Sequence, residues 1–277
     1  MEAHAHGIVT SATLMACGAE FAQAVALAAQ SPKLSVGCHV VLVDGSPVLD
    51  GADVSCLMQN SGGQFRASLS SFSALAVCGR LDQQQIEAEI TAQIRKLQAA
   101  GIQVSHLDTH KHTHMFPVVL RALLRAATSC GVRAVRNPFE PLVFASTGQW
   151  KRQFQLRILR RYQRSFREAL AASGLVTPDG CIGVLATGGL NLTTFTQLTE
   201  NLSDGTWEFV SHPGYNDADL GNVTTRLRES REKELEILTA AGIKKMLQRE
   251  NIELISYRDF ASLSPEPEVP SPLTVKQ

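Results

Sequence analysis

A cluster of residues able to bind a metal and to move protons lies between positions 106 and 114. Histidine or aspartate occupies every second position of this segment: His106, Asp108, His110, His112 and His114. Side chains alternate between the two faces of a strand, so an extended segment would point all five the same way. A solvated His-rich loop and hydrogen-bonded structural histidines are the plainer explanations. Imidazole and carboxylate are, however, the usual ligands of a catalytic divalent metal, and this density at the end of an apolar strand predicts an active site.

Three further residues are candidates for the same site. His39 lies in the apolar stretch 36–43, where a buried structural histidine is the alternative. His212 opens a His-Pro-Gly turn after another apolar stretch, where a general acid could reach substrate, although a plain turn explains the pattern equally well. Arg136 follows a third apolar stretch and could bind a polar substrate group or be an ordinary surface arginine.

The elements that must position these residues alternate between apolar runs and helical patterns, which is typical of α/β proteins. Periodicity predicts strands at 34–43, 102–107, 132–136, 182–186, 207–211 and 253–256. It predicts helices at 20–30, 83–100, 116–130, 149–173, 194–201, 224–240 and 243–249, and a long loop with some helix at 51–80. Such repeated units favour a parallel sheet curled into a barrel, in which chemistry gathers at the carboxyl ends of the strands.

Length and composition limit the class of protein. The 277 residues suffice for a sizeable core, which we expect to be a single domain at 1–261 followed by a disordered Pro/Ser-rich tail at 262–277. The chain is 44% hydrophobic and 19% charged with no net charge, so nothing indicates a nucleic-acid partner. Six scattered cysteines without a CxxC pair, no run of membrane-span length and no signal-peptide core predict a cytoplasmic protein without a disulfide framework.

Several segments together resemble the YdjC-like carbohydrate deacetylases, which include chitooligosaccharide and hopanoid-biosynthesis deacetylases. The most specific is His106-Leu-Asp-Thr-His-Lys-His-Thr-His-Met-Phe-Pro117. Weaker matches run in family order: Gly7 to Met15, Val36 to Gly45, Val135 to Pro138, Ser211 to Tyr215 and Ile255 to Phe260.

The resemblance implies a distorted (β/α) barrel that removes the acetyl group from an N-acetylated sugar. It implies a divalent metal, usually magnesium with zinc as the alternative, held by one aspartate and two histidines. His39 and His110 match the two histidine ligands, and His212 matches the residue expected to protonate the leaving amine. Under this hypothesis we expect Asp108 to take a proton from water or to orient a ligand histidine. We expect His112 and His114 to bind substrate or to support the ligands, and Arg136 to bind substrate.

The chain departs from the family pattern at its N-terminus. Family members begin with a strand that ends in Asn-Ala-Asp-Asp-Phe-Gly, and its aspartates supply the metal carboxylate. This motif is absent here, so we expect a barrel without its first strand, which leaves an unpaired edge and a hole in the core. A start assigned too far downstream and a truncated, impaired paralogue both explain the difference.

The expected substrate is an N-acetylated oligosaccharide or a glycolipid, and the sequence leaves a homodimer open. Two other functions compete with deacetylation. One is a non-catalytic sugar-binding or regulatory protein, because two histidines alone would hold a metal weakly. The other is metal-dependent hydrolysis of another bond such as a phosphoester, against which stands the scarcity of carboxylates near the cluster.

Overall fold

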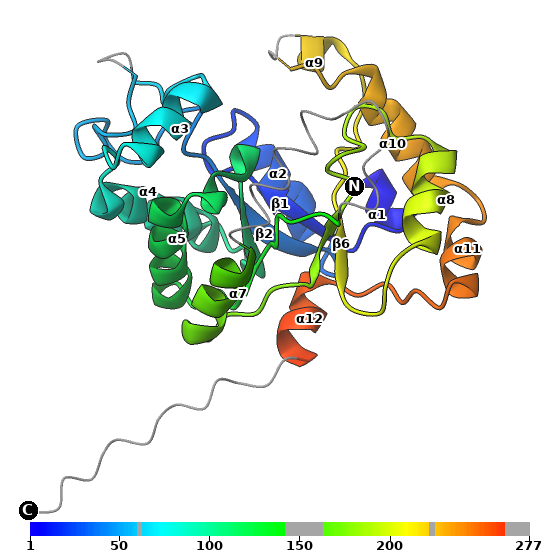
Figure 1. Cartoon of the computed structure of the whole chain (residues 1–277). Helices are drawn as coiled ribbons and strands as arrows, with labels where there is room; N and C mark the ends of the chain where they lie inside the picture. Colours follow the sequence, from blue (N-terminus) through cyan, green and yellow to red (C-terminus); the bar gives the residue numbers. More distant parts are fainter. Residues whose placement is uncertain (60–62, 142–162, 222–224, 264–277) are drawn as a thin grey trace, which may run out of the picture.

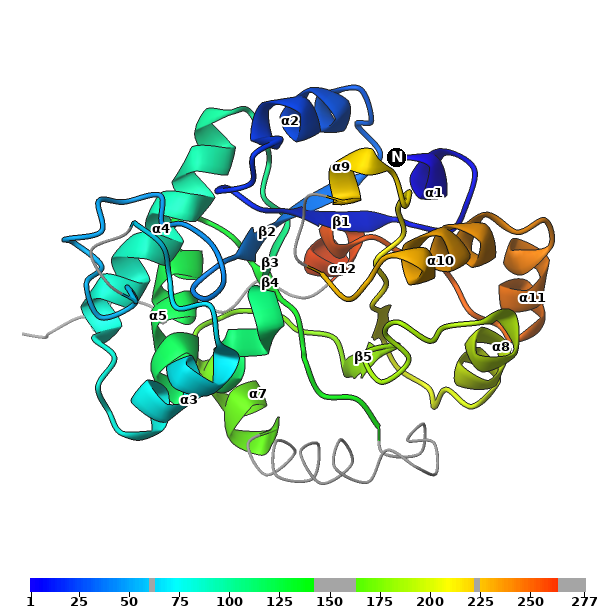
Figure 2. The ribbon, with the colours of Figure 1, turned by 90° about the horizontal axis from the view of Figure 1, so that it is seen from above.

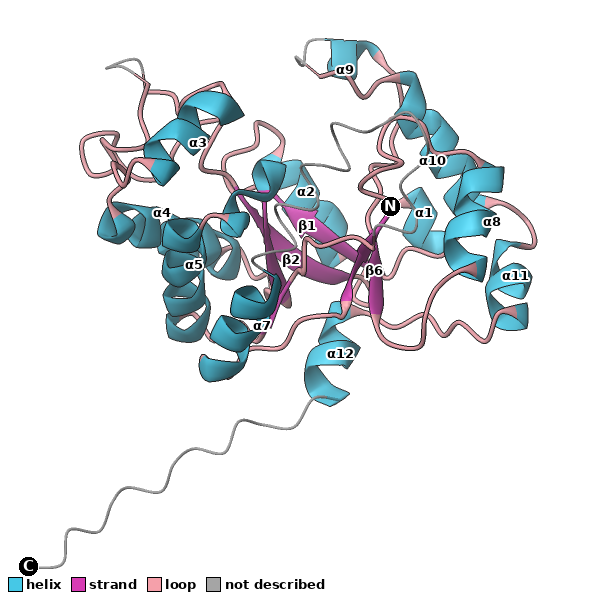
Figure 3. Ribbon diagram, viewed as in Figure 1, coloured by secondary structure: helices cyan, strands magenta, loops and turns pink. Residues whose placement is uncertain are grey.

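The computed structural model describes residues 1–59, 63–141, 163–221 and 225–263 (Figure 1). Helices cover the outside of a central group of parallel strands, as Figure 3 shows. The first half contains α1 (Glu2–Ala5), β1 (Ser11–Leu14), α2 (Phe21–Ala29), β2 (Ser35–Val40), α3 (Leu69–Val77), α4 (Gln83–Ala99), β3 (His106–Thr109), the 3-10 helix η1 (His110–Met115), α5 (Pro117–Ser129) and β4 (Ala134–Val135). The second half contains α7 (Gln163–Ala172), β5 (Gly180–Ile182), α8 (Leu192–Glu200), β6 (Trp207–Phe209), α9 (Ala218–Gly221), α10 (Glu229–Thr239), α11 (Ile243–Arg249) and α12 (Tyr257–Leu263).

The strands form two parallel sheets, which confirms the α/β prediction. The first has the order β1-β2-β3-β4 and the second pairs β5 with β6. A parallel bridge between Ala134 and Val176 connects the first sheet to the segment that leads into β5. Within the described residues no strand pairing joins β1 to β6, so the strands form an open, barrel-like arc rather than a closed barrel. Strand β1 is the edge strand of the first sheet, and in the described part of the chain its one strand partner is β2.

Two groups of buried apolar side chains stabilise the arc. The helices that cover them lie on opposite sides of the strands in Figure 2, with α4 and α5 on the left and α8, α10 and α11 on the right. The larger lies between the first sheet and helices α4 and α5, and the smaller lies among β5, α8, α10 and α11. Helix α4 faces the larger core through the predicted stripe Ile86, Ile90, Ile94 and Leu97, all fully buried. Asp82 caps this helix, because its carboxylate accepts hydrogen bonds from the backbone N–H groups of residues 84 and 85.

A buried polar contact fixes the end of β2, where His39 lies. The Gln93 side chain of α4 accepts from the Val41 backbone N–H at 2.9 Å and donates to the Val41 carbonyl at 2.7 Å. It also donates to Glu89, which accepts from the backbone N–H groups of Val48 and Leu49. Because an unpaired backbone group is costly to bury, these contacts specify where the chain leaves the sheet.

Several sequence predictions need correction. Residues 253–256 are not a strand, because Ile255 accepts a side-chain hydrogen bond from Thr10 and α12 begins two residues later. The edge strand β1 was not predicted, because the run Ser11–Leu14 is short and mixed in polarity. Only Gln163–Ala172 of the expected helix 149–173 is described, and most of the expected tail, 264–277, lies outside the described residues. The single-domain boundary at residue 261 stays a prediction. No helix in the described parts of the chain is long and apolar enough to cross a membrane.

Candidate active site

His39 and Asp108 form the centre of the candidate site, on neighbouring strands. They are partners in the register of β2 and β3, so their side chains lie on the same face of the sheet. His39 Nδ1 lies 2.8 Å from both carboxylate oxygens of Asp108. An ionised carboxylate only accepts hydrogen bonds, so Nδ1 carries a proton, and the neutral tautomer that this contact favours has its lone pair at Nε2.

A change of backbone conformation after Thr109 places the His110 side chain beside His39. The strand ends at Thr109, and η1 follows with Lys111 and His112 in the left-handed region at φ 54°. This turn places His110 Nδ1 3.3 Å from His39 Nε2. The prediction that all five even positions point the same way is therefore wrong beyond Thr109, because the chain is no longer extended there.

Arg136 lies on the other side of Asp108. Its Nη1 atom donates to Asp108, while Nε and Nη2 bind Glu208 on β6 at 2.9 and 2.5 Å. Only 12% of the Arg136 side chain is exposed. The prediction that Arg136 binds substrate is corrected by this geometry, because its guanidinium is occupied by two carboxylates of the protein itself.

These contacts determine the charge of the central residues. Burial would raise the pKa of Asp108, but Arg136 and then His39 outweigh it and hold that pKa well below its ordinary value. Burial, followed by the neighbouring His39, lowers the pKa of His110 to about 4. At neutral pH the site therefore holds an ionised Asp108 beside a neutral His110, and a neutral imidazole is the form that binds metals.

The other predicted histidines differ in their relation to this centre. His114 is fully buried, with its Nδ1 2.6 Å from Thr109 Oγ1 and its ring against Phe166. It therefore cannot contact substrate, which corrects that prediction. His112 is half-buried, and its Nδ1 has no hydrogen-bond partner among the described residues. Burial, followed by Arg136, lowers the pKa of His112 to about 4.

His212 approaches from the loop after β6. Its backbone N–H donates to Glu234 of α10 at 2.5 Å, which holds the His-Pro-Gly turn in place. Burial, then Arg231, Arg136 and His39, lowers the pKa of His212 to about 4. Its Nδ1 atom is enclosed and has no hydrogen-bond partner in the part of the chain that the structure describes. Hydrogen bonds and close contacts join His39, Asp108, His110 and Arg136 from β2, β3 and the residues after β3 and β4 to Glu208 of β6, while a place for His212 in the same site stays a prediction.

Comparison with known protein families identifies the family of this chain. A family model described as YdjC-like protein matches residues 1–249. The chain belongs to this family. Among the similar proteins of this YdjC-like chain, one from Brevibacillus brevis named carbohydrate deacetylase is 32% identical, over 94% of this chain and 92% of that protein. Another of the same name, from Listeria monocytogenes, is 29% identical over the same shares.

A solved structure resembles the fold of this YdjC-like protein. It comes from Enterococcus faecalis V583 and is described as a candidate cellobiose-phosphate cleavage protein. The TM-score is 0.75 at 24% identity, and the match covers 94% of this chain and 90% of that one. At this identity the likeness establishes a shared fold.

The imidazoles of His39 and His110 in this YdjC-like protein are spaced as two ligands of one metal ion would be. Two nitrogen ligands at about 2.1 Å from a tetrahedral zinc ion, the alternative metal, would lie about 3.4 Å apart. His39 Nε2 and His110 Nδ1 are 3.3 Å apart, and Asp108 holds the far side of the His39 ring as carboxylates do for metal-binding histidines. No group of three His, Cys, Asp or Glu suited to a metal occurs among the described residues, so the carboxylate ligand that the resemblance implies is not found there.

Asp108 fits the orienting role better than that of a general base. Its side chain is fully buried, and both oxygens are occupied by His39 and Arg136. A water molecule would have to displace one of these charged contacts before Asp108 could take its proton. Of the two roles considered from sequence, the geometry supports orientation of His39.

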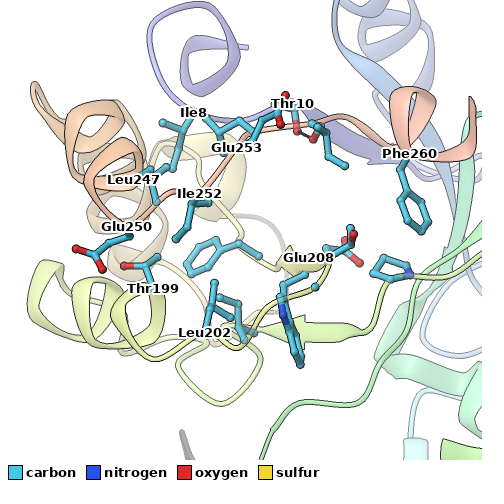
Figure 4. Close-up of a pocket in the computed structure, with 18 of the residues that line it drawn as sticks. Ile8, Thr10, Thr199, Leu202, Glu208, Leu247, Glu250, Ile252, Glu253 and Phe260 are labelled. Carbon is cyan, nitrogen blue, oxygen red and sulfur yellow. Dashed lines mark hydrogen bonds between the residues drawn. The ribbon is translucent and has the colours of Figure 1, made fainter. Parts of the chain in front are cut away.

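Two residues of the site were missed from sequence. Glu208 lies inside β6, and Tyr257 starts α12 with its hydroxyl 2.6 Å from Glu208. A glutamate in the middle of an apolar strand was the available signal for Glu208. Both residues also line a cavity of about 730 Å³ between β1 and β6, and Figure 4 shows Glu208 among its lining residues.

Proposed function

We propose that this protein is a metal-dependent carbohydrate deacetylase, which hydrolyses the amide of an N-acetylated sugar to release acetate. The observation that carries the proposal is the pair of imidazoles 3.3 Å apart, backed by the buried Asp108, at the strand ends of a YdjC-like chain. Relatives named carbohydrate deacetylase match over 94% of the chain, which supports the reaction class. The substrate we propose is an N-acetylated oligosaccharide, with a glycolipid as the alternative.

His39 Nε2 and His110 Nδ1 would hold the metal, for which we propose magnesium, with zinc as the alternative. When bound, a divalent ion polarises the acetyl carbonyl and lowers the pKa of a water molecule. Asp108 keeps the proton of His39 on Nδ1 and so keeps the Nε2 lone pair directed toward the site.

His212 supplies the proton transfers in this proposal. With a pKa of about 4 its ring is neutral at pH 7, so it first accepts a proton from the attacking water. We assign this exchange to Nε2, because Nδ1 is enclosed. As the carbon–nitrogen bond of the amide breaks, the same proton passes to the departing amine. Acetate and a free amino sugar are the products.

The test is acetate release from N-acetylated chito-oligosaccharides with added Mg²⁺ or Zn²⁺. The His110→Ala variant should lose both metal binding and acetate release, whereas the matched variant His6→Ala, at an exposed histidine, should keep both. Full activity of His110→Ala would contradict the assignment. Sugar binding by the wild-type protein without acetate release would instead favour the binding-protein alternative, which the two-imidazole half-site allows.

We also propose a cytoplasmic location. All six cysteines are free, at positions 17, 38, 56, 78, 130 and 181, and this is in keeping with a reducing compartment. Fractionation of native cells with an antibody against the protein would test the location.

A further inference from the structure

A continuous chain of charged contacts leads away from His39 across the sheet. It runs from His39 on β2 to Asp108 on β3, then to Arg136 after β4 and Glu208 on β6. It ends at Tyr257, the first residue of the C-terminal helix α12. This series of contacts therefore couples a candidate metal ligand to the C-terminal helix.

Glu208 determines the orientation of the Arg136 guanidinium. Arg136 Nε lies 2.9 Å from both carboxylate oxygens of Glu208, and Nη2 lies 2.5 Å from Oε1. Such a side-on contact fixes the plane of the guanidinium as well as its position. Because the plane is fixed, the third contact, from Nη1 to Asp108, can form in one direction only.

Tyr257 holds Glu208 from the opposite side. Its hydroxyl donates to Glu208 Oε2 at 2.6 Å, and its ring stacks on His106 with the centroids 3.8 Å apart and the planes 6° from parallel. Its backbone N–H donates to Ser11 Oγ on β1. Burial, and then Glu208, raises the pKa of Tyr257 well above its ordinary value, so the hydroxyl remains a donor. Figure 4 shows Glu208 at the wall of the cavity between β1 and β6.

Glu208 and Tyr257, at the end of this series of contacts, determine the orientation of the Asp108 carboxylate toward His39. Asp108 has no exposed surface, so its contacts with His39 and Arg136 are the ones that orient its carboxylate. If Glu208 lost its charge, the guanidinium would keep one carboxylate partner and turn toward it. Asp108 would then be drawn from His39 Nδ1, and the ring would no longer be fixed in one tautomer.

We propose that Glu208 and Tyr257 are positioning residues that, through Arg136 and Asp108, keep the His39 ring in the tautomer with its lone pair at Nε2. Neither side chain touches the two imidazoles. The catalytic part of this inference rests on the proposed deacetylase function, while the tautomer and metal affinity do not.

The test compares Glu208→Gln with Glu200→Gln, an exposed glutamate at the rim of the same cavity. Nitrogen-15 NMR of the histidine rings should show His39 with its proton on Nδ1 in the wild type and a mixture of tautomers in Glu208→Gln. Affinity for Mn²⁺ should fall by about 10- to 100-fold, as for other residues that orient metal ligands. Where acetate release is measurable, kcat should fall with KM nearly unchanged. Glu200→Gln should match the wild type in every measurement.

Tyr257→Phe is the second variant, in case Glu208→Gln does not fold. It removes one hydrogen bond and keeps the ring that stacks on His106, so the same changes should appear with smaller size. Wild-type His39 tautomer and Mn²⁺ affinity in either folded variant, including one that is only less stable, would overturn the proposal. If the wild-type protein releases no acetate, the proposed function fails, but the NMR and Mn²⁺ measurements still decide the role of Glu208.

Discussion

His39 and Asp108 are register partners on adjacent parallel strands, and His39 Nδ1 lies 2.8 Å from both oxygens of the Asp108 carboxylate. The pair brings a charge to a place with no solvent access, which Arg136 compensates. A buried charge is costly unless it is paired, so this contact ties the integrity of the sheet to the geometry of the site.

Asp108→Asn should therefore affect stability and metal binding together. The neutral amide leaves Arg136 with one carboxylate partner, and breaking a buried ion pair costs about 3–5 kcal/mol. Denaturant unfolding of the metal-free protein measures the stability. The control is Asp44→Asn, which removes the partly exposed ion pair of Asp44 with Lys111 and should cost less than about 1 kcal/mol. An equal loss of unfolding free energy in the two variants would show that the buried ion pair contributes no more to stability than the partly exposed one.

Gly37→Ala tests the close packing of β2 against β3. A Cβ atom at Gly37 would lie 2.6 Å from the carbonyl oxygen and two ring atoms of His106. Because one of these atoms belongs to the backbone, the strands must move apart, at a cost of about 1–3 kcal/mol. Gly221→Ala, in a helix with nothing near the added atom, should be neutral or slightly stabilising. An unchanged unfolding midpoint for Gly37→Ala would contradict the described contact of these strands.

The parts of the fold that sequence predicts well are those with local causes. Helix α4 has its cap at Asp82 and its apolar stripe within its own residues, so it was predicted to within one residue. The rule that parallel strands end at one edge predicts that His39, His110 and His212 lie close together, and the structure places His39 Nε2 3.3 Å from His110 Nδ1. The contact between Arg136 and Glu208 joins positions 72 residues apart, so no local sequence pattern predicts it.

The backbone after Thr109 is the clearest case that sequence could not predict. Lys111 and His112 are both left-handed, a conformation rare for residues other than glycine, asparagine and aspartate. The alternating pattern of 106–114 suggested an extended chain instead. Tertiary contacts override it: Lys111 Nζ lies 2.7 Å from Asp44, and the His114 backbone N–H donates to Thr109 Oγ1.

This strain gives a further prediction, that Lys111→Gly is more stable than Lys111→Ala. Both variants lose the contact with Asp44, so their difference reports the backbone alone. Glycine avoids the cost of the left-handed conformation, about 1–2 kcal/mol, although it has more freedom when unfolded. Exposed Ala88 in the middle of α4 is the control, because the Ala88→Gly variant should be less stable than the wild-type protein by about 1 kcal/mol. If alanine is the more stable residue at both positions, Lys111 is not left-handed in solution.

Acidification should destabilise the protein through its two fully buried histidines. Burial is the main cause that lowers the pKa of His106 to about 4 and of His114 to about 3, against an ordinary value of 6.5. Below pH 6.5 these two histidines bind protons in the unfolded chain but stay neutral in the folded protein. Their contribution to stability is therefore complete above pH 6.5 and is lost as the pH falls toward 4 for His106 and 3 for His114. Each group contributes about 1.4 kcal/mol per pH unit over this range.

Denaturant unfolding between pH 7.5 and pH 5 measures this slope. His114→Gln should lower it by about 1.4 kcal/mol per pH unit, whatever its effect on stability at pH 7.5. Leu123→Ala, at a fully buried position without a titratable group, is the matched control. It should lower the free energy of unfolding by about 2–5 kcal/mol at every pH and leave the slope unchanged. If His114→Gln also leaves the slope unchanged, His114 is charged in the folded protein and its burial does not hold it neutral.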